Sequence, residues 1–259
     1  MTQPAGTASA PELSLVMPCY NEQDAVGYTI PDLVRAFRGK GHRLELIAVD
    51  NGSTDATGAR LADLAAEFPE VVPITVPVNQ GYGHGILVGF GACTAPWVGS
   101  IVADGQVDAE DVVRLFEAVR PTQGRALGKV RRRFRMDGVA RKVVSSFYNF
   151  FVRMLWPRLG SIDINGSPKL FSREALEAMQ LGSTGWLLDP EIMVKAHELG
   201  LRVIELNVFA RMRSTGLSHV RAATCWEFFH HLLAARIRGA WKPGHRLPST
   251  PVEQEVPGI

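Results

Sequence analysis

The sequence has few cysteines. The three that it contains, Cys19, Cys93 and Cys225, lie far apart and show no metal-ligand spacing. An odd number cannot pair completely, so we expect neither a disulfide framework nor a structural zinc site. This cysteine usage is typical of a protein in the reducing cytoplasm.

The sequence also lacks a long hydrophobic run. A membrane-spanning helix needs about 20 apolar residues, whereas the most apolar stretch, residues 147–156, is interrupted by Asn149 and Arg153. Residues 1–11 are small and polar, unlike a secretory signal or a transit peptide. We therefore expect no membrane span, although a helix of this composition can lie on a membrane surface.

The sequence also lacks a large excess of charge of either sign. The 28 basic and 26 acidic residues leave a formal net charge of +2, which gives no general reason to expect nucleic-acid binding. The 259 residues, 46% of them hydrophobic, are enough for one large α/β domain with a real core. We expect this domain to span residues 12–242, between disordered tails at 1–11 and 243–259 that are rich in Pro, Ser, Thr and Gly.

Short apolar runs alternate with segments that have hydrophobic residues at helical spacing. This alternation predicts βαβ units and a mainly parallel sheet, whose ligands bind beyond the carboxyl ends of the strands. The expected strands are residues 13–18, 44–49, 71–76 and 97–103, and the expected helices are residues 23–38, 55–68, 85–94 and 109–119.

Polar clusters follow three of these strands, at residues 18–22, 50–55 and 104–108. Each has an ordinary explanation: Asn21 and Asp55 as helix caps, Asn51 with Gly52 as a turn, Asp108 at the start of a capped helix. Clustered carboxylates cost free energy unless a cation or hydrogen bonds compensate them. Three such clusters meeting at one edge of the sheet therefore favour a binding site.

Six segments in chain order resemble the motifs of family 2 glycosyltransferases, especially the dolichyl- and polyprenyl-phosphate glycosyltransferases. The resemblance covers residues 13 to about 220. The segments are VMPCYNE (16–22), VDNGSTD (49–55), NQGYGHG (79–85), ADGQVD (103–108), DINGSPKLF (163–171) and LDPEI (188–192).

The resemblance implies a Rossmann-like glycosyltransferase A fold, in which a mainly parallel central sheet is flanked by helices. It also implies a UDP- or GDP-linked sugar donor, with Asp50 at the uracil or guanine edge. The loop with Gly81 and Gly83 would pass close to the nucleotide, where small residues permit approach. The implied nucleotide-sugar-binding residues are Pro18, Tyr20, Glu22, Asp50, Asn51, Gly81, Gly83, Ala103, Asp104 and Gln106.

The same resemblance implies Mg²⁺ or Mn²⁺ as a cofactor that bridges the diphosphate. Asp104 and Gln106 are the implied metal ligands. The family pattern also places an acid at position 102, where this chain has Val102. This departure puts the metal affinity in question.

Basic residues are concentrated between residues 129 and 142, where a solvated face or a nucleic-acid patch is the ordinary interpretation. We do not expect nucleic acid, because no known binding motif accompanies them. By resemblance the stretch grips phosphate, and the segment RSTGLSH (213–219) is similar to a mobile loop that closes over the diphosphate. The expected acceptor- and phosphate-binding residues are Lys129, Arg131, Arg135, Lys169, Arg213 and Ser218.

Two segments, residues 143–156 and about 220–241, combine aromatic stripes with basic residues. Core packing is the commoner explanation of such stripes, but the combination is also typical of a helix at a membrane surface. We therefore keep peripheral contact with the cytoplasmic face of a membrane as an expectation.

Asp189 and Glu191 occupy the position where the family carries an acid near the sugar and the acceptor. Asp189 is the first candidate for a general base if the acceptor is a hydroxyl, and Glu191 is the second. A phosphate acceptor is already ionised near neutral pH, so the acid would then orient groups. Asp189 before Pro190 could instead be a helix cap.

The sequence thus predicts an inverting glycosyltransferase that moves a sugar from a UDP- or GDP-sugar to a polyprenyl phosphate. One alternative is a soluble transferase that acts on a small natural product or nucleoside. Another is a nucleotide-sugar-binding protein without turnover, which only Val102 favours.

Overall fold

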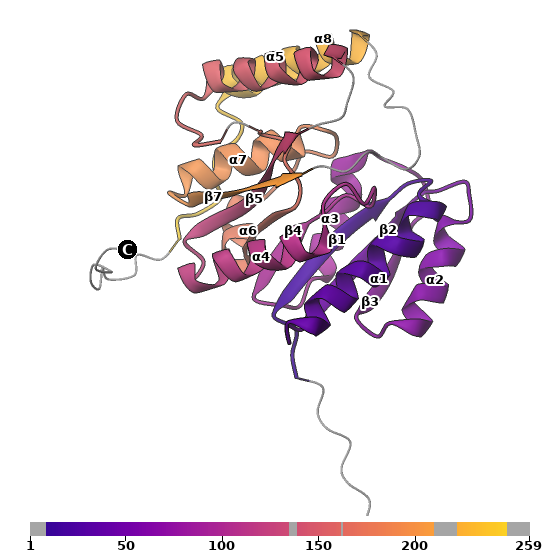
Figure 1. Cartoon of the computed structure of the whole chain (residues 1–259). Coiled ribbons are helices and arrows are strands. Elements are labelled where there is room, and N and C mark those ends of the chain that lie inside the picture. Colours follow the sequence, from indigo (N-terminus) through magenta and orange to yellow (C-terminus); the bar gives the residue numbers. More distant parts are fainter. Residues whose placement is uncertain (1–8, 135–138, 162, 210–221, 248–259) are drawn as a thin grey trace, which may run out of the picture.

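A computed structural model describes residues 9–134, 139–161, 163–209 and 222–247. Their centre is a seven-stranded sheet in the order β3-β2-β1-β4-β6-β5-β7, with helices on both faces (Figure 1). The strands are β1 (Leu13–Cys19), β2 (Leu44–Asn51), β3 (Val71–Val76), β4 (Trp97–Ser100), β5 (Ala126–Phe134), β6 (Lys169–Ser172) and β7 (Arg202–Phe209). The helices are α1 (Gln23–Gly39), α2 (Thr57–Glu67), α3 (Tyr82–Ala92), α4 (Ala109–Val119), the short 3₁₀ helix η1 (Arg120–Thr122), α5 (Val139–Leu155), α6 (Arg173–Met179), α7 (Leu188–Glu198) and α8 (Ala222–Arg238).

The first four strand–helix pairs lie where the hydrophobic pattern predicts them. The differences are at the ends: α3 begins at Tyr82 rather than residue 85, and β4 ends at Ser100 rather than residue 103. Helix α3 starts early because its first turn docks against residues 183–185, a tertiary contact that local sequence does not reveal.

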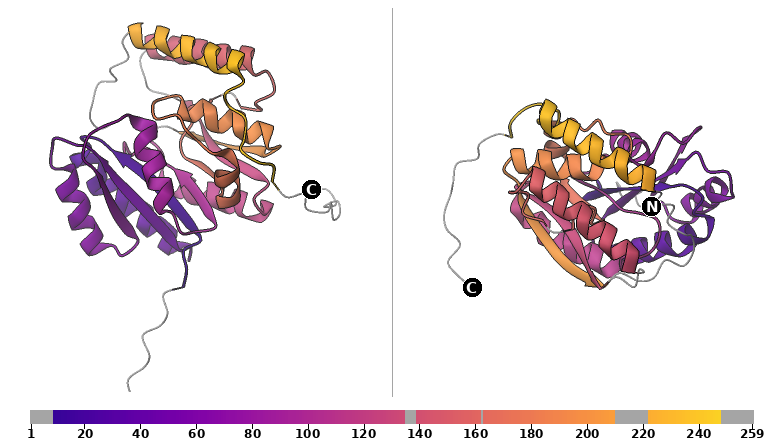
Figure 2. Two further views of the ribbon diagram at one scale, coloured as in Figure 1. Left: turned by 180° about the vertical axis from the view of Figure 1, so that it is seen from behind. Right: turned by 90° about the horizontal axis from the view of Figure 1, so that it is seen from above.

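Alternation along β1 divides the core into two clusters, one on each face of the sheet. Leu13, Leu15 and Met17 pack with residues of α1, α2 and α4, whereas Val16 packs with residues of α3, α6 and α7. Successive side chains of a strand point to opposite faces, so every second residue serves the same helix layer. The view from behind shows α3 on the face opposite α1, α2 and α4 (Figure 2).

The second half of the sheet departs from simple parallel winding. Strand β6 runs antiparallel to both of its neighbours, and β7 returns parallel to β5. The start of β6 therefore lies at the same edge as the carboxyl end of β4, with Lys169 opposite Ser100. This arrangement adds residues of β5 and β6 to the edge where the polar clusters gather.

Helices α5 and α8 lie side by side above α7, and both pictures agree on this (Figures 1 and 2). Aromatic contacts join the pair: Phe229 meets Phe147 and Phe151, with ring centroids 5.4 Å and 4.9 Å apart. Within the described residues, no helix has the length and apolar character needed to cross a bilayer.

The chain after α8 contacts the domain beyond the expected boundary at residue 242. Residues 243–247 were expected in a disordered tail, but the Gly244 N–H donates to the carbonyl of Ala178 at 2.8 Å. Trp241 stacks on Trp156, with 5.4 Å between ring centroids, and Leu247 packs against the core. Trp241 is buried and Leu247 is partly buried, so the described chain stays in contact with the domain up to residue 247.

Candidate functional site

The loops after β1 and β2 are tied together by hydrogen bonds. The Asn21 side chain accepts from the Thr54 N–H at 2.8 Å, and the Asn21 N–H donates to Ser53 Oγ at 3.1 Å. Asp55 accepts from the Thr57 N–H at the start of α2, but the N-cap residues of α1 and α2 are Glu22 and Ala56, so neither Asn21 nor Asp55 is itself the N-cap. The two polar clusters thus form one structure at the carboxyl edge.

Five of the predicted nucleotide-binding residues lie in or beside these loops, in different environments. Tyr20 is 47% exposed and presents an aromatic ring at the end of β1. Asp50 accepts from the Ser53 N–H at 3.0 Å. Asn51 is buried; its Nδ2 donates to the Gly81 carbonyl at 3.0 Å, and its Oδ1 has no hydrogen-bond partner among the described residues. Pro18 and Glu22 are half-buried in the same region.

The two predicted glycines, Gly81 and Gly83, have a structural reason for being small. A Cβ at Gly83 would lie 2.4 Å from the carbonyl oxygen of Ser183, and one at Gly81 would lie 2.7 Å from that of Thr184. The expected reason was close approach to a nucleotide. The structure gives another reason: these glycines let the 79–85 loop pack directly against backbone before α7.

The segment after β4 holds the predicted metal ligands, and both are buried. The Asp104 carboxylate accepts from the Gln106 N–H at 3.1 Å, and Gly105 between them has a φ of 64°. The Ala103 carbonyl accepts from the Thr29 hydroxyl of α1 at 3.1 Å, and the Val102 N–H donates to Ser167 Oγ at 3.3 Å. These contacts connect the segment to α1 and to the loop before β6.

Asp189 forms a buried ion pair with Lys169, whose side chain is fully buried. Asp189 lies inside the first turn of α7, whose N-cap residue is Leu187. The helix-cap interpretation of Asp189 is therefore wrong. Burial raises the pKa of the nearby Tyr148 phenol well above its usual value, with a further contribution from the charges of Asp189 and Asp163.

Glu191 holds the backbone of the preceding loop. Its carboxylate accepts from the N–H groups of Gly182 and Ser183, the latter at 2.8 Å, and pairs with Lys195 at 2.7 Å. Lys195 in turn donates to the Gln180 carbonyl at 2.8 Å. These contacts give Glu191 a structural role and leave Asp189 as the stronger catalytic candidate.

Lys129 was predicted on a basic surface that binds phosphate, but its side chain is fully buried. Its ammonium group donates to Ser161 Oγ at 3.1 Å, to the Asp163 carbonyl, and to Glu205 at 3.3 Å. The pKa of Lys129 is lowered to about 8, mainly by burial and in smaller part by the neighbouring positive charge of Lys169. Because these partners enclose it, Lys129 supports the loop before β6 rather than offering its charge to solvent.

The other predicted acceptor residues divide into two groups. Lys169 faces Asp189, as described, and Arg131 is half-buried on β5. Arg135, Arg213 and Ser218 lie outside the described residues. Their expected phosphate contacts stay predictions.

The contacts described above form a continuous path along the edge of the sheet. It runs from Asn51 through the 79–85 loop to residues 182–186, then along α7 to Asp189. From Lys169 it continues through Ser167 to the Asp104 segment and α1. The sequence did not identify Ser167, Tyr148 or Lys195 as part of this site; only the i, i+4 spacing of Glu191 and Lys195 signalled one of their contacts.

The family model described as "Glycosyl transferase family 2" matches residues 14–179. A dolichyl-phosphate beta-glucosyltransferase from Trichomonas vaginalis is 26% identical over 249 residues, covering 89% of this chain and 75% of that protein. A polyprenol monophosphomannose synthase from Mycolicibacterium smegmatis is also 26% identical over 249 residues, covering 91% of each chain.

An undecaprenyl-phosphate 4-deoxy-4-formamido-L-arabinose transferase from Pectobacterium carotovorum is 33% identical over 143 residues. That match covers 54% of this chain and 43% of the relative, so the chain spans less than half of that protein.

Among solved structures, glucosyl-3-phosphoglycerate synthase from Mycobacterium tuberculosis, in complex with Mn²⁺, UDP-glucose and phosphoglyceric acid, superposes with a TM-score of 0.71. The two are 20% identical, and the match covers 87% of this chain and 79% of that one. The expected glycosyltransferase A fold is thereby confirmed.

Proposed function

This chain belongs to glycosyl transferase family 2 and is an enzyme, and we propose that it transfers a sugar from a UDP- or GDP-sugar to a polyprenyl phosphate. One observation carries the proposal: the Asp104 segment and the buried Asp189–Lys169 pair lie at one sheet edge and are linked through Ser167. The names of the similar dolichyl-, polyprenol- and undecaprenyl-phosphate enzymes support the acceptor class.

We infer that a divalent cation, Mg²⁺ or Mn²⁺, is the cofactor. The described residues contain no group of three His, Cys, Asp or Glu side chains arranged to hold a metal. Asp104 and Gln106 supply one carboxylate and one amide, both buried. This donor set fits Mg²⁺ or Mn²⁺, because such ions are commonly held by one or two carboxylates together with phosphates of the substrate. A bound cation would stabilise the negative charge of the departing nucleoside diphosphate.

The Asp189–Lys169 pair supports an orienting role for Asp189. In inverting transfer the acceptor oxygen bonds to the anomeric carbon from one side while the bond to the diphosphate oxygen breaks on the other. A phosphate acceptor is largely ionised near neutral pH and needs no general base. Lys169 fixes the Asp189 carboxylate, which can then position the sugar or the acceptor; with a hydroxyl acceptor, the same carboxylate would take the proton.

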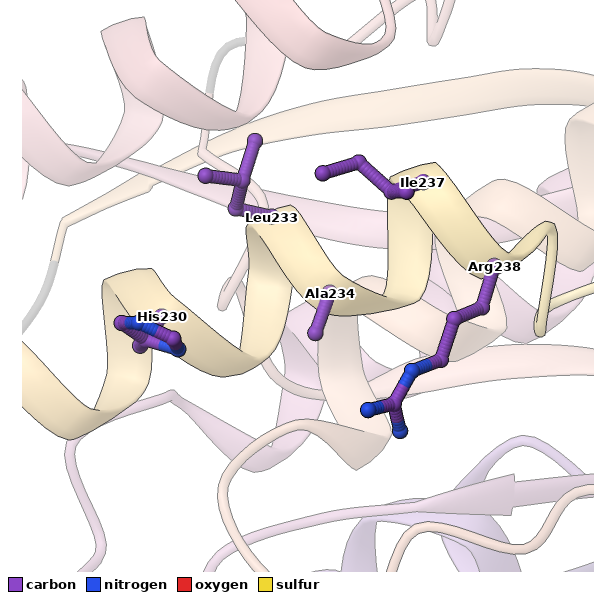
Figure 3. A pocket seen from close by; sticks show the side chains of 5 residues that line it. All are labelled: His230, Leu233, Ala234, Ile237 and Arg238. Atoms are coloured by element: carbon purple, nitrogen blue, oxygen red, sulfur yellow. The ribbon is translucent and has the colours of Figure 1, made fainter.

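The pair of helices α5 and α8 supports contact with the cytoplasmic face of a membrane. Large apolar side chains are exposed on both helices: Phe147, Phe150, Met154, Leu233 and Ile237. Figure 3 shows Leu233 and Ile237 on one side of α8, and Ala234 and Arg238 on the other. Arg153, Arg236 and Arg238 are exposed nearby, and basic residues beside apolar ones suit an anionic lipid surface.

The test is a transfer assay with the full-length chain, Mn²⁺ and radiolabelled UDP-glucose or GDP-mannose. Undecaprenyl phosphate in detergent and 3-phosphoglycerate serve as alternative acceptors. We expect organic-extractable label from one donor with the lipid acceptor, and at least a 100-fold lower rate for Asp104→Asn. Label in the water-soluble product alone would instead establish the alternative of a soluble acceptor.

Measuring nucleotide binding tests the donor class independently of the acceptor. We expect UDP or GDP to raise the melting temperature of the protein in a Mn²⁺-dependent manner. Val102→Asp adds the acid that the family pattern places there, so it should increase Mn²⁺ affinity. Stabilisation by neither nucleotide, with or without Mn²⁺, would refute the proposed donor class.

A further inference from the structure

Tyr82 and Trp186 form an aromatic stack at the surface beside the site. Their ring centroids are 4.9 Å apart and their planes differ by 14°. Trp186 is 60% exposed even though indole is among the largest apolar side chains. A single exposed apolar residue is ordinary; this one is distinguished by how it is held and where it lies.

The backbone just before Trp186 is held by hydrogen bonds from two elements, α3 and α7. On one side the His84 N–H donates to the Thr184 carbonyl at 2.7 Å, next to the close approach of Gly83. On the other side the buried Glu191 carboxylate accepts from Gly182 and Ser183. Loops on a protein surface are usually mobile. This one is held by α3 and by Glu191 in the three residues 182–184 just before Gly185 and Trp186, which favours a fixed position for the exposed indole.

The two residues of the stack come from segments that belong to different parts of the site: one contains the residues predicted to bind the nucleotide, and the other contains the predicted catalytic acid. Tyr82 directly follows Gly81, whose carbonyl accepts from the side chain of Asn51, a predicted nucleotide-binding residue. Trp186 lies three residues before Asp189, which pairs with Lys169, a predicted acceptor-binding residue. In a sugar transfer, the group that lies between the nucleoside diphosphate and the acceptor is the transferred sugar.

We propose that the Tyr82–Trp186 stack is the contact surface for the transferred sugar of the donor, which lies with the C–H face of its pyranose ring against the indole. The inference rests on the proposed function. The face of an aromatic ring carries partial negative charge, and ring C–H groups of a pyranose carry partial positive charge, so the two attract. A nucleobase is a less suitable occupant, because the residues predicted to bind the nucleotide, among them Tyr20 and Asn51, lie in the loops after β1 and β2.

The experiment compares binding of nucleotide-sugars and free nucleotides by calorimetry, with UDP-glucose against UDP and GDP-mannose against GDP. We expect Trp186→Ala to weaken binding of the nucleotide-sugar about tenfold and to change that of the free nucleotide less than twofold. Trp186→Phe should keep most of the affinity because it keeps an aromatic face. Val72→Ala, an exposed apolar residue on edge strand β3, is the control and should change neither.

The other outcomes are informative in different ways. Equal losses for nucleotide and nucleotide-sugar would overturn the inference and assign Trp186 to the nucleotide or to loop integrity. An unchanged donor affinity with a raised KM for the lipid acceptor would also overturn it and assign the stack to the isoprenoid. If the unmodified protein bound no nucleotide-sugar, the proposed function itself would fail, and this inference with it.

Discussion

At the residue scale, two of the buried lysines of the site, Lys129 and Lys169, depend on different partners. Lys169 is compensated by Asp189. Lys129 lies opposite Lys169 in the β5–β6 register and is compensated by Ser161, the Asp163 carbonyl and Glu205. Each charge is costly to bury alone, so each pair links local stability to the geometry of the site.

Asp189→Ala should destabilise the protein as well as inactivate it. The substitution leaves the ammonium group of Lys169 buried without its charge partner, which costs about 3 kcal/mol of unfolding free energy. The double variant Asp189→Leu/Lys169→Met removes both charges and should regain most of that stability without regaining turnover. Urea unfolding and the transfer assay measure the two effects. Equal stability of the single and double variants would mean that the pair is not energetically coupled.

The pH dependence of stability should carry the signature of Lys129. Its pKa is about 8 in the folded chain and 10.5 as the ordinary lysine value, so between these values the unfolded chain binds a proton that the folded chain has released. The free energy of unfolding therefore increases, through Lys129, as the pH rises from about 8 to 10.5.

Lys129→Met should remove this gain, which the difference between variant and parent in urea unfolding at pH 7.5, 8.25 and 9 would measure. The range stops at pH 9 because burial raises the pKa of Cys93 to about 12, so thiol ionisation favours the unfolded chain at higher pH. Parallel stability curves for the two proteins would show that Lys129 is not perturbed.

At the element scale, the start of α3 and the loop before α7 act as one unit. In an ordinary helix, Gly→Ala stabilises by about 1 kcal/mol. At Gly83 the added Cβ would lie 2.4 Å from the Ser183 carbonyl oxygen and 2.7 Å from that of Gly185. Steric overlap with fixed backbone therefore outweighs helix propensity at this position.

We expect Gly83→Ala to lower the unfolding free energy by about 2 kcal/mol and to weaken donor binding, because the loop with Trp186 must move. Gly91→Ala is a matched control in the same helix, where an added Cβ meets no atom within 4 Å. The control should be neutral or slightly stabilising. Thermal unfolding and calorimetry measure both effects, and a stabilised Gly83→Ala would contradict the tight packing.

At the scale of the whole molecule, the helices α5 and α8 present apolar side chains that the fold does not bury. Phe150 is 65% exposed and Ile237 is 75% exposed. Burial of such a side chain contributes about 1.5–3 kcal/mol. If a bilayer covers this surface, these residues supply much of the binding free energy.

Phe150→Glu/Ile237→Glu should reduce co-sedimentation with anionic vesicles at least tenfold, because it replaces apolar contacts by charge repulsion. Transfer to a short-chain, water-soluble polyprenyl phosphate should continue at its original rate. Val72→Glu, on the edge strand β3, should change neither property. Undiminished vesicle binding by the double variant would exclude this surface as the membrane contact.

The order of residues along the chain is enough to predict the first half of the fold and the position of its polar clusters. The alternation of strand β1, with Leu13 and Leu15 on one face and Val16 on the other, follows directly from residue order. Parallel strands also send their carboxyl ends to one edge, so residues 18–22, 50–55 and 104–108 had to gather there.

Which buried groups compensate one another became visible only in the three-dimensional arrangement of the strands. Lys129 and Glu205 are 76 residues apart in the chain, and Lys169 reaches the site because β6 runs antiparallel between β4 and β5. The small size of Gly83 is explained by contact with residues 183–185 rather than by its own motif. The local sequence pattern specifies the spacing of hydrophobic residues and the ends of helices. The partner of a buried charge depends instead on strand order and register, which are set by contacts between distant parts of the chain.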